Sequence, residues 1–493
     1  MDANQPVKRR GRAVKSGKGK AAEFKAGGAA GPKEFNPEAI SSELNLWWEN
    51  GDGTSFLLGD GKGTWSRWPE KKIMNLLRSK FVRLKPREGE TLGEADQVLM
   101  HTMQNRRLEL ALSAIAGYPA GIYDLNGLRV LVRTSPRIVE PKEGKWDSIY
   151  ALIHSKLDFS YSDDEGHGLD QTPYFHGWMK TALEGLYLGG PGNFRPGQCC
   201  IFAGPRDSGK SRLQHQVITG LLGGRSADPG PYLFGRTDFN GEMFSAEHLM
   251  MEDPASSTKT ADRVFFGEML KQLVVNDTQR LHRKREDAMV VSPFFRTTIS
   301  INDDPDKMRV LPLLTPDMKD KVHLFLVSGC PLPVPAKTLE ERAAFRASIA
   351  AELPAYAWFL LNEFKIPEAM HSARFGVKEW HHPALALELF DDTPAAELLQ
   401  ILDAATFFPD DEKLWDHESD SKSKGELWEG TALSLERLIL DDKCSVKTEA
   451  KKLCMHNKVD RLLSRLKEDQ PERVAQHRTK LARNWVISRP SSL

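Results

Sequence analysis

The residue types and spacing that most clearly predict chemistry lie at positions 204–211, in the segment GPRDSGKS. Gly204 and Gly209 let backbone N–H groups turn inward around phosphate oxygens, and a helix starting here adds its partial positive charge. Lys210 would reach the β and γ phosphates of ATP, and Ser211 would offer its hydroxyl to Mg²⁺. The predicted nucleotide-binding residues are Gly204, Pro205, Arg206, Asp207, Ser208, Gly209, Lys210, Ser211 and Arg212.

The residues on either side supply the elements that such a loop requires. Residues 198–203, QCCIFA, form a short apolar run typical of a buried strand, and residues 211–220 have helical periodicity. Strand, glycine loop and helix in this order distinguish a phosphate-binding loop from a chance match in an ordinary turn.

A second apolar run, HLMMED at 248–253, ends in two acids about 40 residues after the loop. One carboxylate would hold the Mg²⁺ shell and the other would orient or deprotonate the attacking water. The order Glu252-Asp253 does not show which acid has which task. We expect Ser211 and Asp253 to be the two residues that bind the metal. The alternative is a plain strand end with solvated acids.

A third run, FRTTISIND at 295–303, alternates like a strand and ends in Asn302. A polar amide at the tip of a central strand can touch the γ-phosphate or position the water. Taken alone the signal is weak, because an asparagine at a strand end is usually a turn former.

These three elements, in this order and spacing, resemble the motifs of the superfamily 3 helicases. Those are hexameric AAA+ ATPases of viruses, phages and plasmids, and they include the phage and poxvirus primase-helicases. The resemblance is specific over about 195–330. It implies an α/β fold with an AAA+ P-loop core, a homohexameric ring, and catalysis by Lys210, Glu252, Asp253 and Asn302.

The superfamily carries a further motif, a lysine-containing helix followed by a hairpin that contacts DNA. The stretch 269–303 resembles it, with Lys271 on the helix and a predicted hairpin tip of His282, Arg283, Lys284 and Arg285. Clustered cations of this kind can follow a phosphate backbone without reading bases. Taken alone, the run would more often be a solvated surface loop.

The superfamily usually places arginines after its sensor motif, and these reach the nucleotide of the neighbouring subunit. Arg309 is the only arginine between positions 302 and 330 of this chain. Lysine does not replace arginine at a two-pronged phosphate contact. Arg309 is therefore the preferred trans-acting residue, with Lys319 and Lys321 as rivals.

Changes in composition and turn-forming residues divide the chain into segments. Its segments are a basic tail at 1–35, an N-terminal α/β domain at 36–168, the helicase-like ATPase domain with a helical extension at 169–405, a polar linker at 406–426, and a C-terminal domain at 427–493. In the second segment, tryptophans among Gly-Asp turns predict a small β unit. Helical patterns follow near 70–83 and 97–116, and Asn126-Gly127 predicts a hairpin.

The C-terminal segment predicts three helices, at 431–440, 446–453 and 459–467, followed by strands at 473–478 and 484–487 with a basic turn between them. Three helices and a basic hairpin form a winged-helix layout, in which the third helix would enter a DNA groove. A small oligomerisation or partner domain is the alternative.

Bulk composition narrows the remaining possibilities. Lys plus Arg and Asp plus Glu each total 68, and a zero net charge excludes neither nucleic acid nor protein partners. No run of about 18 apolar residues predicts a membrane span, and the N-terminus has no apolar signal core, so we expect a cytoplasmic protein. The five cysteines include no CxxC pair and predict reduced thiols rather than a zinc site.

The sequence-based hypothesis is thus an ATP-dependent DNA helicase or translocase, with ATP and Mg²⁺ as cofactors, acting in replication of a phage, plasmid or other mobile element. Two rivals remain open. One is a replication initiator whose ATPase only controls assembly, and the other is an ATPase of a defence or packaging complex. Single-stranded or forked DNA and other replication proteins are the expected partners.

Overall fold

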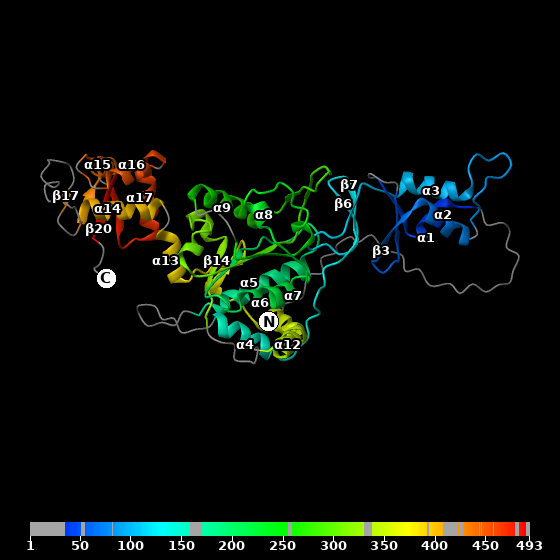
Figure 1. Ribbon diagram of the computed structural model, residues 1–493, viewed down its shortest axis with the longest axis horizontal. Coiled ribbons are helices and arrows are strands. Elements are labelled where there is room, and N and C mark those ends of the chain that lie inside the picture. Colours follow the sequence, from blue (N-terminus) through cyan, green and yellow to red (C-terminus); the bar gives the residue numbers. More distant parts are fainter. Residues whose placement is uncertain are drawn as a thin grey trace, which may run out of the picture.

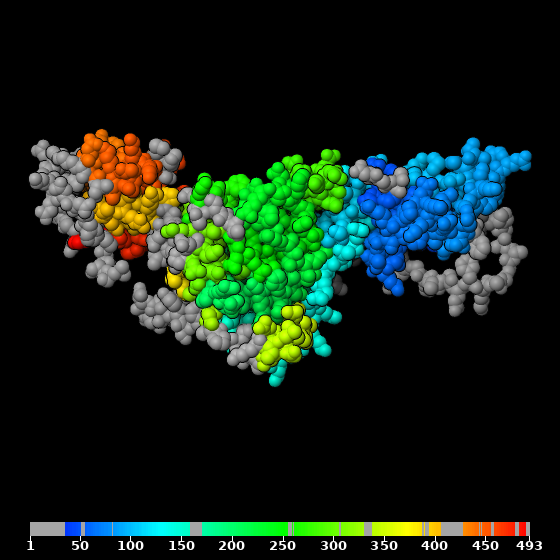
Figure 2. Space-filling model, viewed as in Figure 1, coloured from blue at the N-terminus to red at the C-terminus, as the bar shows by residue number. Residues whose placement is uncertain are grey.

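The computed structural model shows three lobes, an N-terminal lobe (35–108), a central lobe (109–391) and a C-terminal lobe (394–489), which appear as separate masses in Figures 1 and 2. The structure describes residues 35–50, 55–80, 82–157, 170–254, 259–329, 338–391, 394–407, 422–423, 427–442, 444, 446–456, 458–478 and 483–489. The predicted tail, apart from Phe35, and most of the predicted linker at 406–426 lie outside the described residues.

The central lobe is a mixed α/β unit built on a five-stranded parallel sheet, in the order β14-β8-β13-β10-β9. The strands are β8 (Cys199–Ala203), β9 (Ser226–Ala227), β10 (His248–Glu252), β13 (Arg296–Ile301) and β14 (Val322–Leu326). Strands of a parallel sheet are covered on both faces, which explains why these segments read as nearly continuous apolar runs. The strands predicted around the nucleotide motifs are confirmed.

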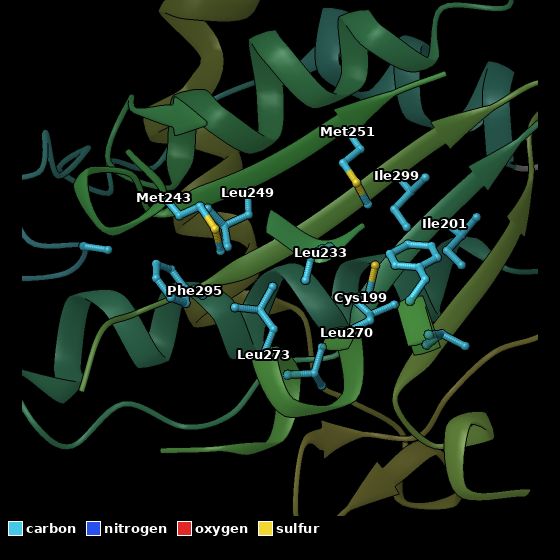
Figure 3. Packing of buried hydrophobic residues seen from close by; sticks show 14 of the residues in the cluster. Cys199, Ile201, Leu233, Met243, Leu249, Met251, Leu270, Leu273, Phe295 and Ile299 are labelled. Atoms are coloured by element: carbon cyan, nitrogen blue, oxygen red, sulfur yellow. The ribbon is translucent and has the colours of Figure 1, made fainter. Parts of the chain in front are cut away.

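Alternate side chains of the sheet enter two separate cores. Cys199 and Ile201 pack with α9 (Thr260–Val275) on one face, as Figure 3 shows around Leu270 and Leu273. Cys200 and Phe202 belong to the core of the opposite face. This period-two alternation between two helical layers gives a three-layer sandwich.

Three long helices cover that opposite face: α4 (Asp147–Leu157), α5 (Thr172–Glu184) and α12 (Leu339–Trp358). The helix after the glycine loop lies beside them. It comprises α6 (Lys210–Arg212), a π-type stretch (Leu213–Ile218) and α7 (Thr219–Leu221). Gly220 brings it close to α12, since a Cβ there would lie 2.8 Å from a Leu353 methyl carbon.

The N-terminal lobe combines three helices with a small sheet in the order β3-β2-β1-β4. Its elements are α1 (Pro37–Glu43), β1 (Leu46–Glu49), β2 (Ser55–Gly59), β3 (Trp65–Pro69), α2 (Glu70–Ser79), α3 (Glu94–Asn105) and β4 (Arg107–Leu108). The predicted β unit is confirmed. The helix expected to continue to residue 116 is wrong beyond Asn105, because Arg107 pairs with Trp48 of β1 and Leu110 pairs with Val130.

A β-hairpin that follows β4 joins the N-terminal lobe to the central lobe. Strands β6 (Gly121–Leu125) and β7 (Leu128–Val132) pair antiparallel, and β5 (Leu110–Leu112) lies parallel to β7. The predicted turn is confirmed, with left-handed φ angles of 55° at Asn126 and 81° at Gly127. Val130 enters the central core while Leu131 packs on Leu57 of the N-terminal lobe, so this hairpin fastens the two lobes together.

The C-terminal lobe contains the three helices and the hairpin that the sequence predicts. Its elements are α14 (Pro394–Leu402), β17 (Lys422–Ser423), β18 (Leu427–Gly430), α15 (Ala432–Ile439), α16 (Lys447–His456), α17 (Val459–Asp469), β19 (Val474–Arg478) and β20 (Arg483–Ser488). Strand β20 pairs with both β19 and β18. Leu398 and Leu402 of α14 pack into the same core as Leu463 and Trp485, so the lobe begins before the expected linker.

Short elements complete the described chain. They are α8 (Gly230–Leu233), α10 (Pro305–Met308), α11 (Pro316–Lys319), α13 (Pro383–Asp391), β11 (Gln279–Leu281), β12 (Met289–Val291), β15 (His371–Ser372) and β16 (Gly376–Val377), with π-type or 3₁₀ turns at 185–189, 243–245, 359–363, 368–370 and 403–407. Within the described ranges, no helix is long and apolar enough to cross a membrane.

Candidate nucleotide and nucleic-acid sites

The glycine loop leaves β8 at its carboxyl end and closes around its own lysine. Lys210 is only 8% exposed, and its ammonium donates hydrogen bonds of 2.7 Å to the carbonyl oxygens of both Gly204 and Pro205. The turn uses left-handed backbone at Asp207 (φ 60°) and Gly209 (φ 95°). A side chain at Gly204 is impossible without movement, because its Cβ would lie 2.3 Å from the Val327 carbonyl oxygen. These glycines are therefore required by the backbone path.

The two acids at the end of β10 have different partners. The Glu252 carboxylate interacts with two side chains of the helix after the loop, His215, whose Nε2 lies 3.3 Å from Glu252 Oε2, and Ser211. Burial alone would raise the pKa of Glu252, but these interactions together hold it below its ordinary value. Asp253 adopts left-handed backbone (φ 41°) and donates its N–H to the Ser300 carbonyl oxygen at 2.9 Å. The backbone thus turns sharply between the two carboxylates.

Asn302 lies beside Lys210, and nearby carboxylates act on the lysine through their charge. Asn302 Oδ1 is 3.4 Å from Lys210 Nζ. Burial lowers the pKa of Lys210, and the charges of Asp253, Asp303 and Asp207 oppose this effect. Sequence reasoning missed Asp303, whose only signal was its position directly after Asn302.

A buried polar network holds the helix after the loop against the acidic strand. His248 Nδ1 lies 2.7 Å from the Thr219 hydroxyl, and His248 Nε2 lies 2.7 Å from the Thr298 hydroxyl. The Gln214 amide donates to the same Thr298 oxygen at 2.7 Å. Burial lowers the pKa of His248 to about 3, so the ring is neutral at physiological pH and can both donate and accept in this network.

The predicted DNA-contacting hairpin is present as β11 and β12, which pair antiparallel with Leu281 opposite Met289. We call it, with its tip at residues 282–288, the cationic hairpin. Lys284 and Arg285 are exposed at the tip, whereas Arg283 is half-buried and forms a 3.0 Å ion pair with Glu286. Two of the predicted cations therefore face solvent.

Asn240 fastens the preceding loop to this hairpin. Its backbone N–H donates to the His282 carbonyl oxygen at 3.0 Å, its Oδ1 accepts from the His282 N–H at 2.8 Å, and its Nδ2 donates to the Arg280 carbonyl oxygen at 2.8 Å. The neighbouring Phe239 is 45% exposed, with its ring 5.0 Å from that of His282. A cavity of about 530 Å³ opens beside them, lined also by Arg283 and Lys284. The sequence-based prediction did not include Asn240 and Phe239. The feature that could have identified them is an aromatic residue beside an Asn-Gly pair.

The other predicted cations lie elsewhere in the central lobe. Lys271, on α9 as predicted, forms a 2.7 Å ion pair with Asp317. Lys319 pairs with Asp469 of the C-terminal lobe, and Lys321 pairs with Asp320. Arg309 is exposed directly after α10.

The structure thus brings the glycine loop, both acids and Asn302 to one edge of the sheet. They follow the carboxyl ends of β8, β10 and β13, three adjacent strands, and parallel sheets bind ligands at this edge. The charge of Asp253 acts on Lys210, and the Ser211 side chain interacts with Glu252. This arrangement can hold a phosphate chain and a divalent cation, and it can polarise a water molecule beside them.

Comparison with known proteins gives only distant likenesses. No family model matches the chain, and no curated protein matches it. The solved apo structure of the NrS-1 C-terminal region covers 92% of this chain and 100% of its own, at 12% identity and a TM-score of 0.49. A JCV helicase covers 44% of this chain and 52% of its own, at 15% identity and a TM-score of 0.25. The active helicase Cch of SCCmec type IV covers 87% of this chain and 73% of its own, at 11% identity and a TM-score of 0.29. At these TM-scores the likenesses carry no functional argument, and the assignment below depends on the site.

Proposed function

We propose that this chain is an ATP hydrolase that unwinds or translocates along DNA, of the superfamily 3 type, in the replication of a phage, plasmid or other mobile element. The observation that carries the proposal is the convergence of Lys210, Ser211, Glu252, Asp253 and Asn302 at one edge of the parallel sheet. A cation, a hydroxyl and paired carboxylates at that edge are what phosphoryl transfer to water requires.

The oxygen donors at the site fit Mg²⁺, which prefers carboxylate, hydroxyl and phosphate oxygens. The Ser211 side chain interacts with the Glu252 carboxylate and lowers its pKa. We therefore assign the metal shell to Ser211 and Glu252, a different division from the sequence-based pair of Ser211 and Asp253. The ion, when bound, would neutralise charge that develops on the phosphate oxygens.

The protein's own groups then have separate tasks. Lys210 leaves the loop carbonyls and binds the β and γ phosphates. Asp253, on the lysine side of the site, accepts a proton from the attacking water, and Asn302 holds that water or the γ-phosphate by hydrogen bonds. His215 holds the Glu252 carboxylate in place.

DNA binding is proposed for the cationic hairpin. Lys284 and Arg285 offer exposed charge to a phosphate backbone, and Phe239 offers an exposed ring on which a base could stack. His282 is held beside that ring by Asn240. In a homohexameric ring, which we also propose, each subunit would present one such hairpin to the central channel.

The C-terminal lobe is proposed to be a winged-helix domain that binds duplex DNA or replication proteins. Its three helices and two-stranded β hairpin support this reading. Arg461 and Arg465 lie exposed on α17, the third helix, where contacts to a DNA groove would be made.

Two assays together test the function. Steady-state ATP hydrolysis, with and without single-stranded DNA, should rise severalfold when DNA is added. Strand displacement on a forked duplex should then require hydrolysable ATP. Hydrolysis without displacement would favour the initiator, and hydrolysis that responds only to a co-purifying protein would favour a defence or packaging complex.

A further inference from the structure

Two arginine–tryptophan pairs lie at the junction of the N-terminal and central lobes, beside β7 (Figure 1). We call them the Arg–Trp strip: Arg129 with Trp47, and Arg133 with Trp65. Arg129, Leu131 and Arg133 point to the same side of the chain, because side chains alternate along an extended strand. The Arg133 N–H donates to the Leu112 carbonyl oxygen at 3.0 Å, so the ladder continues one residue past β7. Leu131 packs on Leu57, and the two arginines therefore flank a contact with the N-terminal lobe.

The first pair is held in place by contacts on both of its members. The Arg129 guanidinium carbon lies 5.8 Å from the centroid of the Trp47 ring, and its Nη1 donates to the Arg107 carbonyl oxygen at 3.3 Å. Arg106 lies 4.3 Å from the same ring centroid, and Trp47 Nε1 donates to Asn45 Oδ1 at 3.0 Å. An exposed cation on a fixed ring is prepared for a ligand before the ligand binds.

The second pair lines a cavity of about 450 Å³. Arg133 and Trp65 share it with the hydroxyl side chains of Ser113, Thr134 and Ser135. The Arg133 side chain makes no hydrogen bond within the described ranges, and its Nε is buried without an acceptor. A guanidinium group, hydroxyl groups and an aromatic ring around one cavity suit a phosphate and the base attached to it.

Carboxylates do not neutralise the strip. In the part of the chain that the structure describes, neither Arg129 nor Arg133 forms an ion pair, whereas the neighbouring Arg107 lies 3.6 Å from Glu109. Cations that track a phosphate backbone, combined with rings on which bases stack, are the features that bind single-stranded nucleic acid. An acidic protein segment would use the arginines but not the Trp65 ring, so a single strand fits the strip better.

The strip lies next to the tip of the cationic hairpin. Leu128, the residue before Arg129, lines a cavity of about 970 Å³ together with Arg285 of the tip. Three of the four acids that line this cavity pair with arginines: Glu49 with Arg67, Glu109 with Arg107, and Glu286 with Arg283. The space between tip and strip is therefore largely balanced in charge.

We propose that the Arg–Trp strip is a second contact for single-stranded nucleic acid, next along the strand from the cationic hairpin. Arg129 and Arg133, about 13 Å apart along β7, bind two phosphates of one strand. Trp65 stacks on a base in the cavity that it lines. The N-terminal lobe thereby helps to hold the strand. This inference rests on the nucleic-acid partner of the proposed function.

The test compares three fluorescent probes over a series of salt concentrations: oligo-dT, an abasic oligonucleotide of the same length and a poly-glutamate peptide. The full chain is measured as the wild type, as Arg129→Gln/Arg133→Gln and as Trp65→Leu. Arg78→Gln removes an exposed arginine from α2 and is the charge control. Trp68→Leu is the ring control, because Trp68 lies on the same strand but packs into the core on its other face.

The double arginine variant should bind both oligonucleotides more weakly. Its salt slope should fall by about 1.4, since each lost phosphate contact on a single strand lowers the slope by about 0.7. Trp65→Leu should bind oligo-dT about tenfold more weakly and keep its affinity for the abasic probe, because only bases stack. Both controls should bind like the wild type. Thermal melting checks that each variant is folded, and the exposed arginines decide the outcome if Trp65→Leu melts early.

An unchanged affinity and salt slope for oligo-dT in the folded arginine variant would overturn the inference. A loss confined to the poly-glutamate peptide would also overturn it, and would make the strip a protein-binding surface. Lys284→Ala/Arg285→Ala, measured in the same series, separates this failure from that of the proposed function. If the hairpin variant alone loses affinity, only the strip is wrong, whereas a wild type that does not bind oligo-dT would overturn both.

Discussion

At the scale of the residue, the two adjacent acids at the end of β10 should not be interchangeable. Glu252 interacts with the side chains of His215 and Ser211, while Asp253 itself adopts left-handed backbone and its charge acts on Lys210. Aspartate is one of the few residues that adopt such a turn without a large cost. We therefore propose that the local backbone sets which carboxylate would contact the metal and which would contact the attacking water.

Substitutions that keep shape but remove charge should separate these roles. Glu252→Gln should weaken Mg²⁺-dependent ATP binding and raise the Mg²⁺ concentration needed for half-maximal hydrolysis. Asp253→Asn should bind MgATP normally yet hydrolyse it at least 100-fold more slowly, as expected for loss of a general base. The measurements are MgATP affinity and single-turnover hydrolysis across a Mg²⁺ series. The opposite pattern would restore the sequence-based division.

Sequence reasoning reached the residues whose role follows from a local pattern. The glycine loop and the acidic strand end each carry their chemistry within about eight residues. Asn240 carries no such pattern, because it acts on an element that is distant in the sequence. Its side chain donates to the Arg280 carbonyl oxygen of a strand 40 residues further on.

At the scale of the element, the cationic hairpin is held at its base and exposed at its tip. Asn240 supplies three hydrogen bonds to β11 and its next residue, so the hairpin and the loop before β10 are one unit. A Cβ at Gly241 would lie 2.8 Å from Arg283 Cγ, which shows how closely the two segments pack. The acidic strand follows that loop, and a movement at the nucleotide site could pass to the hairpin through it.

Removing the exposed tip charges should weaken DNA binding without disturbing the ATP site. The double variant Lys284→Ala/Arg285→Ala should bind oligo-dT more weakly, and the salt slope of its affinity should fall by about one to two, since each lost phosphate contact lowers the slope by about 0.7 on single strands. Basal ATP hydrolysis should be unchanged. Binding measured at several salt concentrations tests this, and an unaltered slope would show that the tip does not contact DNA.

The sequence predicts secondary-structure elements most accurately where one hydrophobic period dominates. The sheet strands and the Asn126-Gly127 hairpin follow from short apolar runs and a turn signal. The helix expected over 97–116 failed because its second half pairs with β1 and β7, partners that helical periodicity cannot reveal. Tertiary pairing overrode local preference there.

At the scale of the whole molecule, we propose that the ATP site lies between subunits of a ring. When one heterologous contact is repeated by rotation, about six copies can close into a ring in which no interface is left free. The candidate trans-acting cations are Arg309, Lys319 and Lys321. We propose Arg309 as the donor to the neighbour's γ-phosphate because it is an exposed arginine shortly after Asn302, and arginine suits a two-pronged phosphate contact better than lysine.

Arg309→Ala should bind ATP normally and hydrolyse it about 1000-fold more slowly, the effect such arginines have where they are known. Mixing it with Lys210→Ala subunits should restore part of the activity, because some interfaces then contain both intact residues. Hydrolysis across a mixing series, with mass measured in the presence of ATP and DNA, tests the ring. A monomer that hydrolyses briskly would contradict it, whereas a ring with active Arg309→Ala would move the role to Lys319 or Lys321.

The central claim is that Lys210 binds the phosphates of an ATP that this chain hydrolyses. The measurement that tests it most directly is steady-state ATP hydrolysis by Lys210→Ala beside the wild type, with thermal melting of both. Among the described residues, the Lys210 ammonium bonds to its own loop and to Asn302, and Lys210 is not part of either core of the central lobe, so its loss should leave those cores intact. The account predicts a folded variant, melting within a few degrees of the wild type, that has lost ATP turnover. A folded Lys210→Ala protein with near-normal turnover would contradict it.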